Sequence, residues 1–237
     1  IFVSLLFIMN MITFLVITLL VVHPLKVYIH CIEDKKLFEV TGASEFKYMA
    51  VTYNNIYELN SANEAMLRYK AEHDPLTGIL NRESFFQLQA MMKNSSHPVA
   101  LLLADVDEFK QINDTYGHDM GDKLLKAVAE RLLKCIRSND FAFRIGGDEF
   151  ALIISAEMED SLCMQTKMRI VQSLLLPYEI DGKTLHIGAS CGYAVYPLET
   201  EDTGKIRILA DQRMYAEKKE NHRKAAESQS KDPSPND

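Results

Sequence analysis

The chain has 237 residues, of which 47% are apolar and 25% charged, and its formal net charge is −7. This length and composition suit a folded protein with a sizeable core, and the negative charge argues against a general nucleic-acid binder. The four cysteines are scattered without metal-ligand or redox spacing, which predicts isolated thiols in a reducing compartment.

The N-terminal segment is strongly apolar. No charged residue occurs from Ile1 to Val22, and charges begin at Lys26. A transmembrane helix needs roughly 20 apolar residues, so residues 1–23 are predicted to span a membrane. A signal peptide is disfavoured, because no basic leader precedes the run and no small-residue cleavage site follows it. The lysines that follow favour a cytoplasmic location for the rest of the chain, in a protein of the inner or cell membrane.

Two alternatives to a membrane span stay open. One is a buried core helix, although such a helix would normally show a polar face, and the other is a hydrophobic artefact at the start of the sequence. The chain starts with Ile rather than Met, so we expect a fragment of a longer sensor protein.

Residues 24–71 are predicted to form a connector that is largely helical. Apolar residues recur in it at three- and four-residue intervals, at Phe46, Met49, Tyr53 and Ile56, and Leu67 resumes the same register. Asn60 and Asn63 fall on the same face, so the seam is imperfect. A helix that pairs with its twin in a homodimer suits this pattern. The alternative is a single amphipathic helix that lies on its own domain.

Residues 72–223 are predicted to form one domain in which strands and helices alternate. Asn81 can cap a first helix that runs to about residue 93, and further helices are expected at about 109–114, 121–136, 158–175 and 204–221. The expected strands lie at 99–104, 141–145, 150–154, 178–180 and 185–195. Turns at Gly146–Gly147 and Asp181–Gly182 predict two hairpins. The fold class is therefore α/β, with a mostly antiparallel central sheet flanked by helices. Residues 224–237 are predicted to be a disordered tail.

Acidic residues are expected to meet at one edge of this sheet. Asp105 ends the first strand and Asp107 follows it, while Asp148 and Glu149 come directly after Gly146–Gly147. Carboxylates gathered there repel one another unless they share a cation, and hard divalent ions such as Mg²⁺ prefer oxygen ligands and phosphates. Such ions serve phosphoryl transfer. Two of these residues also have a simpler interpretation: Asp107 is expected mainly to cap the following helix, and Asp148 could be a turn residue.

Three motifs resemble those of GGDEF-domain diguanylate cyclases. Residues 144–150 (RIGGDEF) resemble the signature of that family, and residues 105–118 (DVDEFKQINDTYGH) are similar to its second motif. Residues 74–78 (DPLTG), followed by Asn81 and Arg82, resemble the motif with which the domain begins. The resemblance covers about 150 residues in order, and it implies a fold like the palm of nucleotide cyclases.

The resemblance implies that two GTP molecules become cyclic di-GMP with release of two pyrophosphates, in a site formed by a homodimer. Asp105, Asp148 and the main-chain carbonyl of Val106 would bind Mg²⁺ (or Mn²⁺). Glu149 would join the metal cluster or help to deprotonate the attacking 3′-hydroxyl.

It also assigns the substrate contacts. Asn113 and Asp122 would read guanine, since a carboxylate accepts from donors that adenine lacks, and unpaired polar groups would reject the wrong base. Lys110 and Lys218 would neutralise the triphosphate, unless they are only solvated surface charges. The glycines Gly146 and Gly147 let a phosphate or ribose approach the backbone closely.

One position departs from the family pattern. His222 stands where an arginine that binds phosphate is expected, and Arg223 lies one place beyond. This weakens one expected contact with the triphosphate but leaves the metal ligands intact. A second site is indicated by Arg137 and Asp140, whose spacing before Gly146 matches the inhibitory site that binds the product in this family. The simpler interpretation of this pair is a salt bridge at a helix end.

Two other functions remain as alternatives. The first is a catalytically weak or inactive GGDEF domain that senses GTP or cyclic di-GMP, although such domains usually lose signature carboxylates that this chain keeps. The second is another nucleotide cyclase or polymerase of the same broad fold, which the signature at residues 146–150 disfavours.

Overall fold

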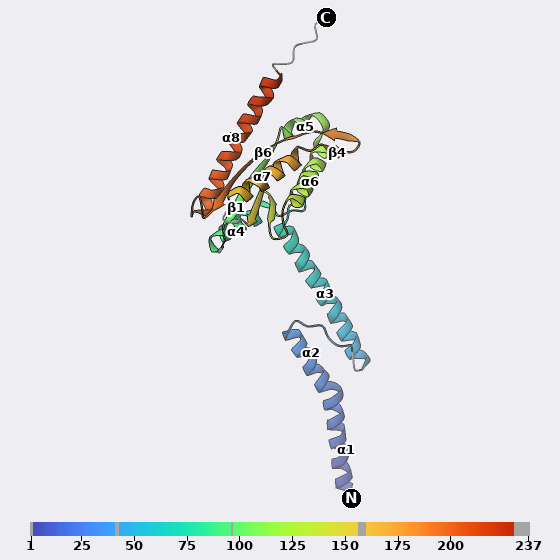
Figure 1. The fold of residues 1–237 in the computed structure, drawn as a ribbon. Coiled ribbons are helices and arrows are strands. Elements are labelled where there is room, and N and C mark those ends of the chain that lie inside the picture. The colour runs from blue at the N-terminus through green and yellow to red at the C-terminus, as the bar shows by residue number, and fades with distance from the viewer. Residues whose placement is uncertain (1, 41–42, 96, 156–159, 230–237) are drawn as a thin grey trace. The chain divides into compact units, whose positions relative to one another are not determined.

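The computed structural model describes residues 2–40, 43–95, 97–155 and 160–229 (Figure 1). The chain divides into two compact units, Ile1–Tyr69 and Lys70–Asp237. The first unit is helical, and the second is built around a sheet.

An apolar helix opens the first unit. Helix α1 (Phe2–Ile17) passes through a π-helical stretch, η1 (Thr18–Val22), into α2 (His23–Glu33). Proline lacks an N–H and its ring crowds the carbonyl four residues earlier, so the wide turn of η1 fits a helix that continues past Pro24. The helix from Phe2 to Glu33 is 32 residues long and contains an 18-residue window with a mean hydropathy of 2.8, so it is long and apolar enough to cross a membrane.

A small aromatic cluster ties α2 to helix α3 (Ser44–Glu72). The ring of Phe38 stacks between Tyr28 and Tyr53, with ring centroids 4.4 Å and 4.0 Å away. The Asn54 side chain accepts from the Phe38 N–H at 2.7 Å and donates to the Phe38 carbonyl at 2.9 Å. Within the predicted connector seam, Phe46 and Tyr53 thus pack inside their own chain. The other seam residues, Met49, Ile56 and Leu67, are 38%, 54% and 67% exposed.

The second unit contains a four-stranded antiparallel sheet in the order β2-β3-β1-β6. The strands are β1 (Val99–Asp107), β2 (Phe141–Arg144), β3 (Glu149–Ser155) and β6 (Gly188–Tyr196). Strand β1 has a neighbour on each side and is buried from Ala100 to Asp107, which explains its apolar run. A separate two-stranded sheet is formed by β4 (Tyr178–Ile180) and β5 (Lys183–Leu185).

Helices cover both faces of the main sheet. Alternate residues of β1 point to opposite faces, so Ala100 and Leu102 join the core under α6 (His118–Cys135) and α7 (Asp160–Leu175). Leu101 and Leu103 join the core under α4 (Arg82–Met91) and α8 (Thr203–Gln229). The remaining helices are α5 (Phe109–Tyr116) and the short η2 (Met92–Asn94). The predicted class, an antiparallel sheet flanked by helices, is confirmed.

The edge strand β6 is covered by helix α8. A side chain at Gly192 would bring its Cβ within 2.1 Å of the Ala210 carbonyl, so only glycine permits this contact. Side chains also occupy the free edge of the strand: Glu217 accepts from the Cys191 N–H, Arg213 donates to the Tyr193 carbonyl, and Glu199 accepts from the Val195 N–H. An edge covered in this way resists pairing with another chain.

Three predicted boundaries were wrong. Strand β1 continues to Asp107, because pairing with β6 outweighs the low β-propensity of its acidic end. The strand expected at residues 185–195 is divided between β5 and β6, with His186 and Ile187 outside both.

The third concerns the tail. Residues 224–229 belong to α8, although a disordered tail was expected from residue 224. Ion pairs of Glu220 with Arg223 and Lys224, and of Arg223 with Glu227, support the helix there. Residues 230–237, and the expected helix start at residues 158–159, lie outside the described residues.

Candidate catalytic site

The pairing of β1 with β3 brings the predicted acidic residues together. Asp105 and Glu149 are register partners, and the Val106 N–H donates to the Asp148 carbonyl at 3.2 Å. Asp105 therefore lies beside the segment that carries Asp148 and Glu149, at the end of the central strand.

Burial and mutual repulsion disfavour negative charge in this cluster. Burial, followed by the nearby Asp148 and Asp107, raises the pKa of Asp105 above its ordinary value, although Lys218 opposes the shift. Burial also raises the pKa of Glu149, together with the charges of Asp105 and Asp148. A positive charge held close to these carboxylates would stabilise their ionised form.

Lys218 supplies one positive charge. Its Nζ lies 2.5 Å from Asp105 Oδ1, and Asp105 is only 7% exposed. Burial would lower the pKa of Lys218, but Asp105, Asp107 and Asp148 outweigh it and raise that pKa. Lys218 reaches the site from α8, more than a hundred residues after β1.

The donor chemistry of the acidic cluster fits a divalent metal ion. Among the described residues, no group of three His, Cys, Asp or Glu side chains is arranged to hold a metal. The expected ligands, Asp105, Asp148 and the carbonyl of Val106, are all oxygen donors, which hard cations prefer. The raised pKa values of Asp105 and Glu149 indicate a place where added positive charge is stabilising.

The glycine turn between β2 and β3 allows Glu149 to fold back. Ile145 and Gly146 both donate their N–H groups to the Glu149 carbonyl, at 3.0 Å and 3.3 Å. A Cβ at Gly146 would lie 2.7 Å from Glu149 Oε2, whereas one at Gly147 would meet nothing within 4 Å. A side chain at Gly146 would therefore displace the Glu149 carboxylate, whereas the backbone at Gly147 is open to an approaching group.

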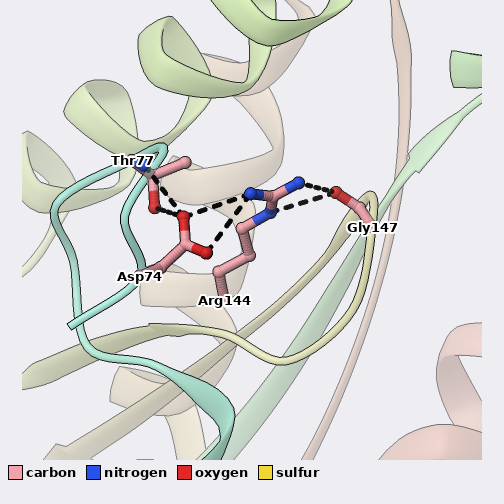
Figure 2. Close-up of polar contacts among 4 residues, drawn as sticks. All are labelled: Asp74, Thr77, Arg144 and Gly147. Carbon is pink, nitrogen blue, oxygen red and sulfur yellow. Dashed lines mark hydrogen bonds and ion pairs between the residues drawn. The ribbon is translucent and has the colours of Figure 1, made fainter. Parts of the chain in front are cut away.

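Arg144 joins this turn to the loop that precedes α4 (Figure 2). Its Nε and Nη2 donate to the Gly147 carbonyl at 3.1 Å and 2.8 Å, and its Nη1 donates to the two carboxylate oxygens of Asp74 at 3.1 Å and 3.3 Å. Asp74 also accepts from the Thr77 N–H and hydroxyl.

The predicted guanine-binding residues lie where α5 meets α6. Asn113 packs against Gly121, where a Cβ would come within 2.0 Å of Asn113 Oδ1. Asp122, the next residue, is exposed, and so is Lys110 on α5. Asn113 and Asp122 therefore lie near each other, and Gly121 makes room for the Asn113 side chain.

Asp107 does not cap the following helix, contrary to its simpler interpretation. Glu108 occupies the cap position with φ 60° and no side-chain cap bond. Asp107 lies inside β1, where both of its carboxylate oxygens accept from the Ser190 hydroxyl at 2.9 Å. Asn221 in turn donates to Ser190 Oγ at 3.2 Å, so the network ties α8 to β6 and β1.

The end of α8 differs from the family pattern in its contacts too. His222 is exposed, and Arg223 pairs with Glu220 on its own helix through contacts of 3.1 Å and 2.9 Å. Arg223 is thus engaged along the helix rather than turned toward Asp105.

The second predicted site has one exposed and one buried member. Arg137 is exposed, whereas Asp140 is buried and accepts from the Arg137 and Ser155 N–H groups at 2.9 Å and 3.1 Å. These are main-chain contacts and not a helix-end salt bridge. Arg169 lines the same small pocket as Arg137 and Asp140 and donates to the Cys135 carbonyl at 2.9 Å.

Sequence reasoning missed two sets of contacts at the site. The Asp74–Arg144 pair joins two motifs that were recognised separately, and only their presence in one domain hinted at a contact. The network of Asp107, Ser190 and Asn221 had no signal, because a serine in a strand and an asparagine in a helix are unremarkable in sequence.

Comparison with known proteins supports the family resemblance. Residues 71–224 match the family described as "Diguanylate cyclase, GGDEF domain". The chain is 35% identical over 187 residues to the diguanylate cyclase DgcN of Escherichia coli, covering 74% of this chain and 45% of DgcN. It spans 24%, 45% and 48% of the length of three curated relatives.

Solved structures show the same fold. The GGDEF domain of TpbB from Pseudomonas aeruginosa is 31% identical with a TM-score of 0.59, and the match covers 62% of this chain and 89% of that chain. The coiled coil and GGDEF domain of DgcB from Caulobacter crescentus, in complex with c-di-GMP, is 26% identical with a TM-score of 0.65. That match covers 75% of this chain and 95% of the other.

Proposed function

The chain belongs to the GGDEF family of diguanylate cyclases, and from that premise we propose that it condenses two GTP molecules into cyclic di-GMP and two pyrophosphates. The observation that carries the proposal is the pairing of β1 with β3, which sets Asp105 beside Asp148 and Glu149. All three signature carboxylates are present, as a nucleotidyl-transfer enzyme needs.

Each condensation forms one phosphodiester bond. The 3′-hydroxyl oxygen of one GTP attacks the α-phosphorus of the other, the bond from the α-phosphorus to the bridging oxygen breaks, and pyrophosphate leaves. The hydroxyl proton would pass to Glu149, which is the register partner of Asp105 at the acidic cluster. The same step on the second pair of groups closes the ring.

Binding of the triphosphate requires positive charge at the acidic cluster. Asp105, Asp148 and the Val106 carbonyl would hold Mg²⁺ or Mn²⁺, which would neutralise the phosphates and lower the pKa of the attacking hydroxyl. Lys218, already paired with Asp105, and Lys110 on α5 would contact the phosphate oxygens. Asn113 and Asp122 would pair with the guanine edge and select GTP over ATP.

The attack requires two GTP-loaded domains to face each other, so the active form is a homodimer. Support comes from the exposed connector residues Met49, Ile56 and Leu67 on α3, and from the coiled coil named in the DgcB structure. The apolar helix from Phe2 to Glu33 would anchor the chain in a membrane, with the catalytic domain in the cytoplasm.

Arg137 and Asp140 would form an inhibitory site for cyclic di-GMP. The main-chain bonds of Asp140 fix its carboxylate, and Arg137 is exposed beside it, with Arg169 lining the same pocket. Arginine suits bidentate recognition of guanine or phosphate.

The alternative is a domain that binds GTP or cyclic di-GMP without turnover. The observation in its favour is the end of α8, where His222 replaces the expected arginine and Arg223 pairs with Glu220.

One assay separates the two functions. The full chain in detergent or lipid nanodiscs is incubated with GTP and Mg²⁺, and products are identified by mass spectrometry. Cyclic di-GMP from wild type but not from Asp148→Asn supports the cyclase. GTP binding without product supports the sensing module and overturns the cyclase.

A further inference from the structure

Arg144 holds the exposed tip of the glycine turn. The turn contains Gly146 and Gly147, and a side chain at Gly147 would meet nothing within 4 Å. Two of the Arg144 nitrogens nonetheless bond the Gly147 carbonyl, at 3.1 Å and 2.8 Å (Figure 2). This carbonyl belongs to the peptide that leads into Asp148, so Arg144 fixes the backbone directly before a predicted metal ligand.

Asp74 in turn fixes Arg144. Its carboxylate accepts from the third guanidinium nitrogen, Nη1. The Asp74 side chain is 17% exposed and that of Arg144 is 15% exposed. The carboxylate is itself oriented by the Thr77 N–H at 2.8 Å and the Thr77 hydroxyl at 2.7 Å. An ion pair that is shielded from water and held from both sides keeps one geometry.

The loop that carries Asp74 is bonded to the end of α3 and to β2. The main-chain carbonyl of Glu72, the last residue of α3, accepts from the Asn81 N–H at 2.9 Å and from the Ser84 hydroxyl at 2.8 Å. Leu80 makes two main-chain hydrogen bonds to β2. Its carbonyl accepts from the Arg144 N–H, and its N–H donates to the Ala142 carbonyl. The loop thus has little freedom to move independently of the strand.

We propose that Asp74 and Arg144 are positioning residues for catalysis, which set the backbone of the Gly146–Gly147 turn and link it to the end of α3. This inference rests on the proposed function, because a fixed turn matters for catalysis only through the positions that it gives to Asp148 and Glu149. A change in how α3 ends would reach the turn through Asp74, two residues later.

Two substitutions test the pair. Asp74→Asn keeps the size of the side chain and its acceptor for Thr77 but removes the charge that faces Arg144. Arg144→Lys keeps the positive charge, but a single ammonium cannot span Asp74 and Gly147 as the guanidinium fork does. The control is Glu199→Gln, which removes the charge from an ion pair with Arg213 in the same domain and, like Asp74→Asn, keeps an acceptor for a main-chain N–H, here that of Val195.

The measurements are kcat and KM for GTP, the melting temperature, and hydrogen exchange at the Ile145 and Gly146 amides, all on the full chain in nanodiscs. Both test variants are expected to lower kcat by roughly 10- to 100-fold, because small misplacements of reacting groups cost that much, while KM changes far less. Exchange at the two amides should become faster. Glu199→Gln should lose similar thermal stability but keep kcat and the slow exchange.

The inference is overturned if Asp74→Asn lowers kcat no more than Glu199→Gln does, with unchanged exchange in the turn. If wild type makes no cyclic di-GMP, the proposed function fails, and exchange alone then decides. Faster exchange at Ile145 and Gly146 in both test variants still supports the positioning role, and unchanged exchange contradicts it.

Discussion

Gly121 is the residue on which the placement of Asn113 depends. In Gly121→Ala the new Cβ would lie 2.0 Å from Asn113 Oδ1, so the amide must move away from its place beside Asp122. Alanine is favoured over glycine in a helix by roughly 1 kcal/mol, so helix loss would not explain a defect. We expect KM for GTP to rise roughly ten-fold, in line with the loss of one or two hydrogen bonds to the base.

A double substitution gives the control for this prediction. If Gly121→Ala acts through Asn113, then Gly121→Ala with Asn113→Ala should bind GTP no more weakly than Asn113→Ala alone. Additive losses, or a wild-type KM in Gly121→Ala, would mean that Asn113 does not contact the substrate from its present position.

Asp74 should make stability depend on pH. Burial alone would raise its pKa, but the bonds from Thr77 and Arg144 outweigh burial and hold the pKa below its ordinary value of 3.8. A carboxyl with a lowered folded-state pKa stabilises the fold above its ordinary pKa and loses that effect as pH falls through the lowered one. The difference in unfolding free energy between wild type and Asp74→Asn should therefore be full at neutral pH and shrink below pH 3.8. Denaturant unfolding across this range measures it, and a difference that grows in acid would contradict the ion pair.

For single residues, the sequence predicted which side chains form the acidic cluster better than it predicted their hydrogen-bond partners. Asp105, Asp148 and Glu149 could be placed together from strand pairing alone. The actual partners of Asp107 could not, because they come from β6 and α8, far along the chain, and a cap is the local interpretation of an aspartate before a helix.

Among the elements, α8 depends on one glycine of β6. Gly192→Ala would place a Cβ 2.1 Å from the Ala210 carbonyl and 2.3 Å from the Met214 N, which would force the helix off the sheet. Overpacking of this kind costs about 1–3 kcal/mol, and in a domain of this size each kcal/mol lowers Tm by roughly 2–4 °C. Thermal unfolding measures the loss. Gly204→Ala is the control, since its Cβ meets only the Asp202 side chain, at 3.2 Å. Equal melting temperatures for the two variants would refute the close contact.

Helix α3 is the element through which two chains would align their catalytic domains. One residue inserted near Ser61 rotates everything beyond it by about 100°, and two residues by about 200°. Both insertions should change cyclic di-GMP synthesis sharply, whereas seven inserted residues restore the facing surface within about 20° and should recover most activity. Unchanged turnover with one and two added residues would count against a role for helix alignment.

Helices and strands were predictable where the local pattern matched the tertiary setting. The alternation of helices and strands, the Asn81 cap and the first hairpin followed from apolar spacing and turn residues. The length of β1 did not, because Asp105 is held in the strand by β3 and β6 together, and Asp107 by β6. The helix at residues 224–229 was not predicted, because the polar composition of the tail is typical of disorder. Ion pairs at i,i+3 and i,i+4 spacing support the helix there.

At the scale of the whole molecule, an apolar helix and a connector helix precede the sheet domain along the chain. This order was predictable from the abrupt shift in composition after Val22 and from the position of the motifs. The aromatic cluster of Tyr28, Phe38 and Tyr53 was not, since it depends on contacts across the segment between α2 and α3.

The central claim is that this chain makes cyclic di-GMP from GTP, and the stoichiometry of the reaction tests it most directly. GTP consumed, pyrophosphate released and cyclic di-GMP formed are measured together for the full chain in nanodiscs with Mg²⁺, with ATP as the parallel substrate and Asp148→Asn as the inactive control. The account predicts two GTP used and two pyrophosphates released for each cyclic di-GMP, with no cyclic product from ATP or from the variant. GTP that is bound and recovered intact, or a cyclic mononucleotide as the product, would contradict it.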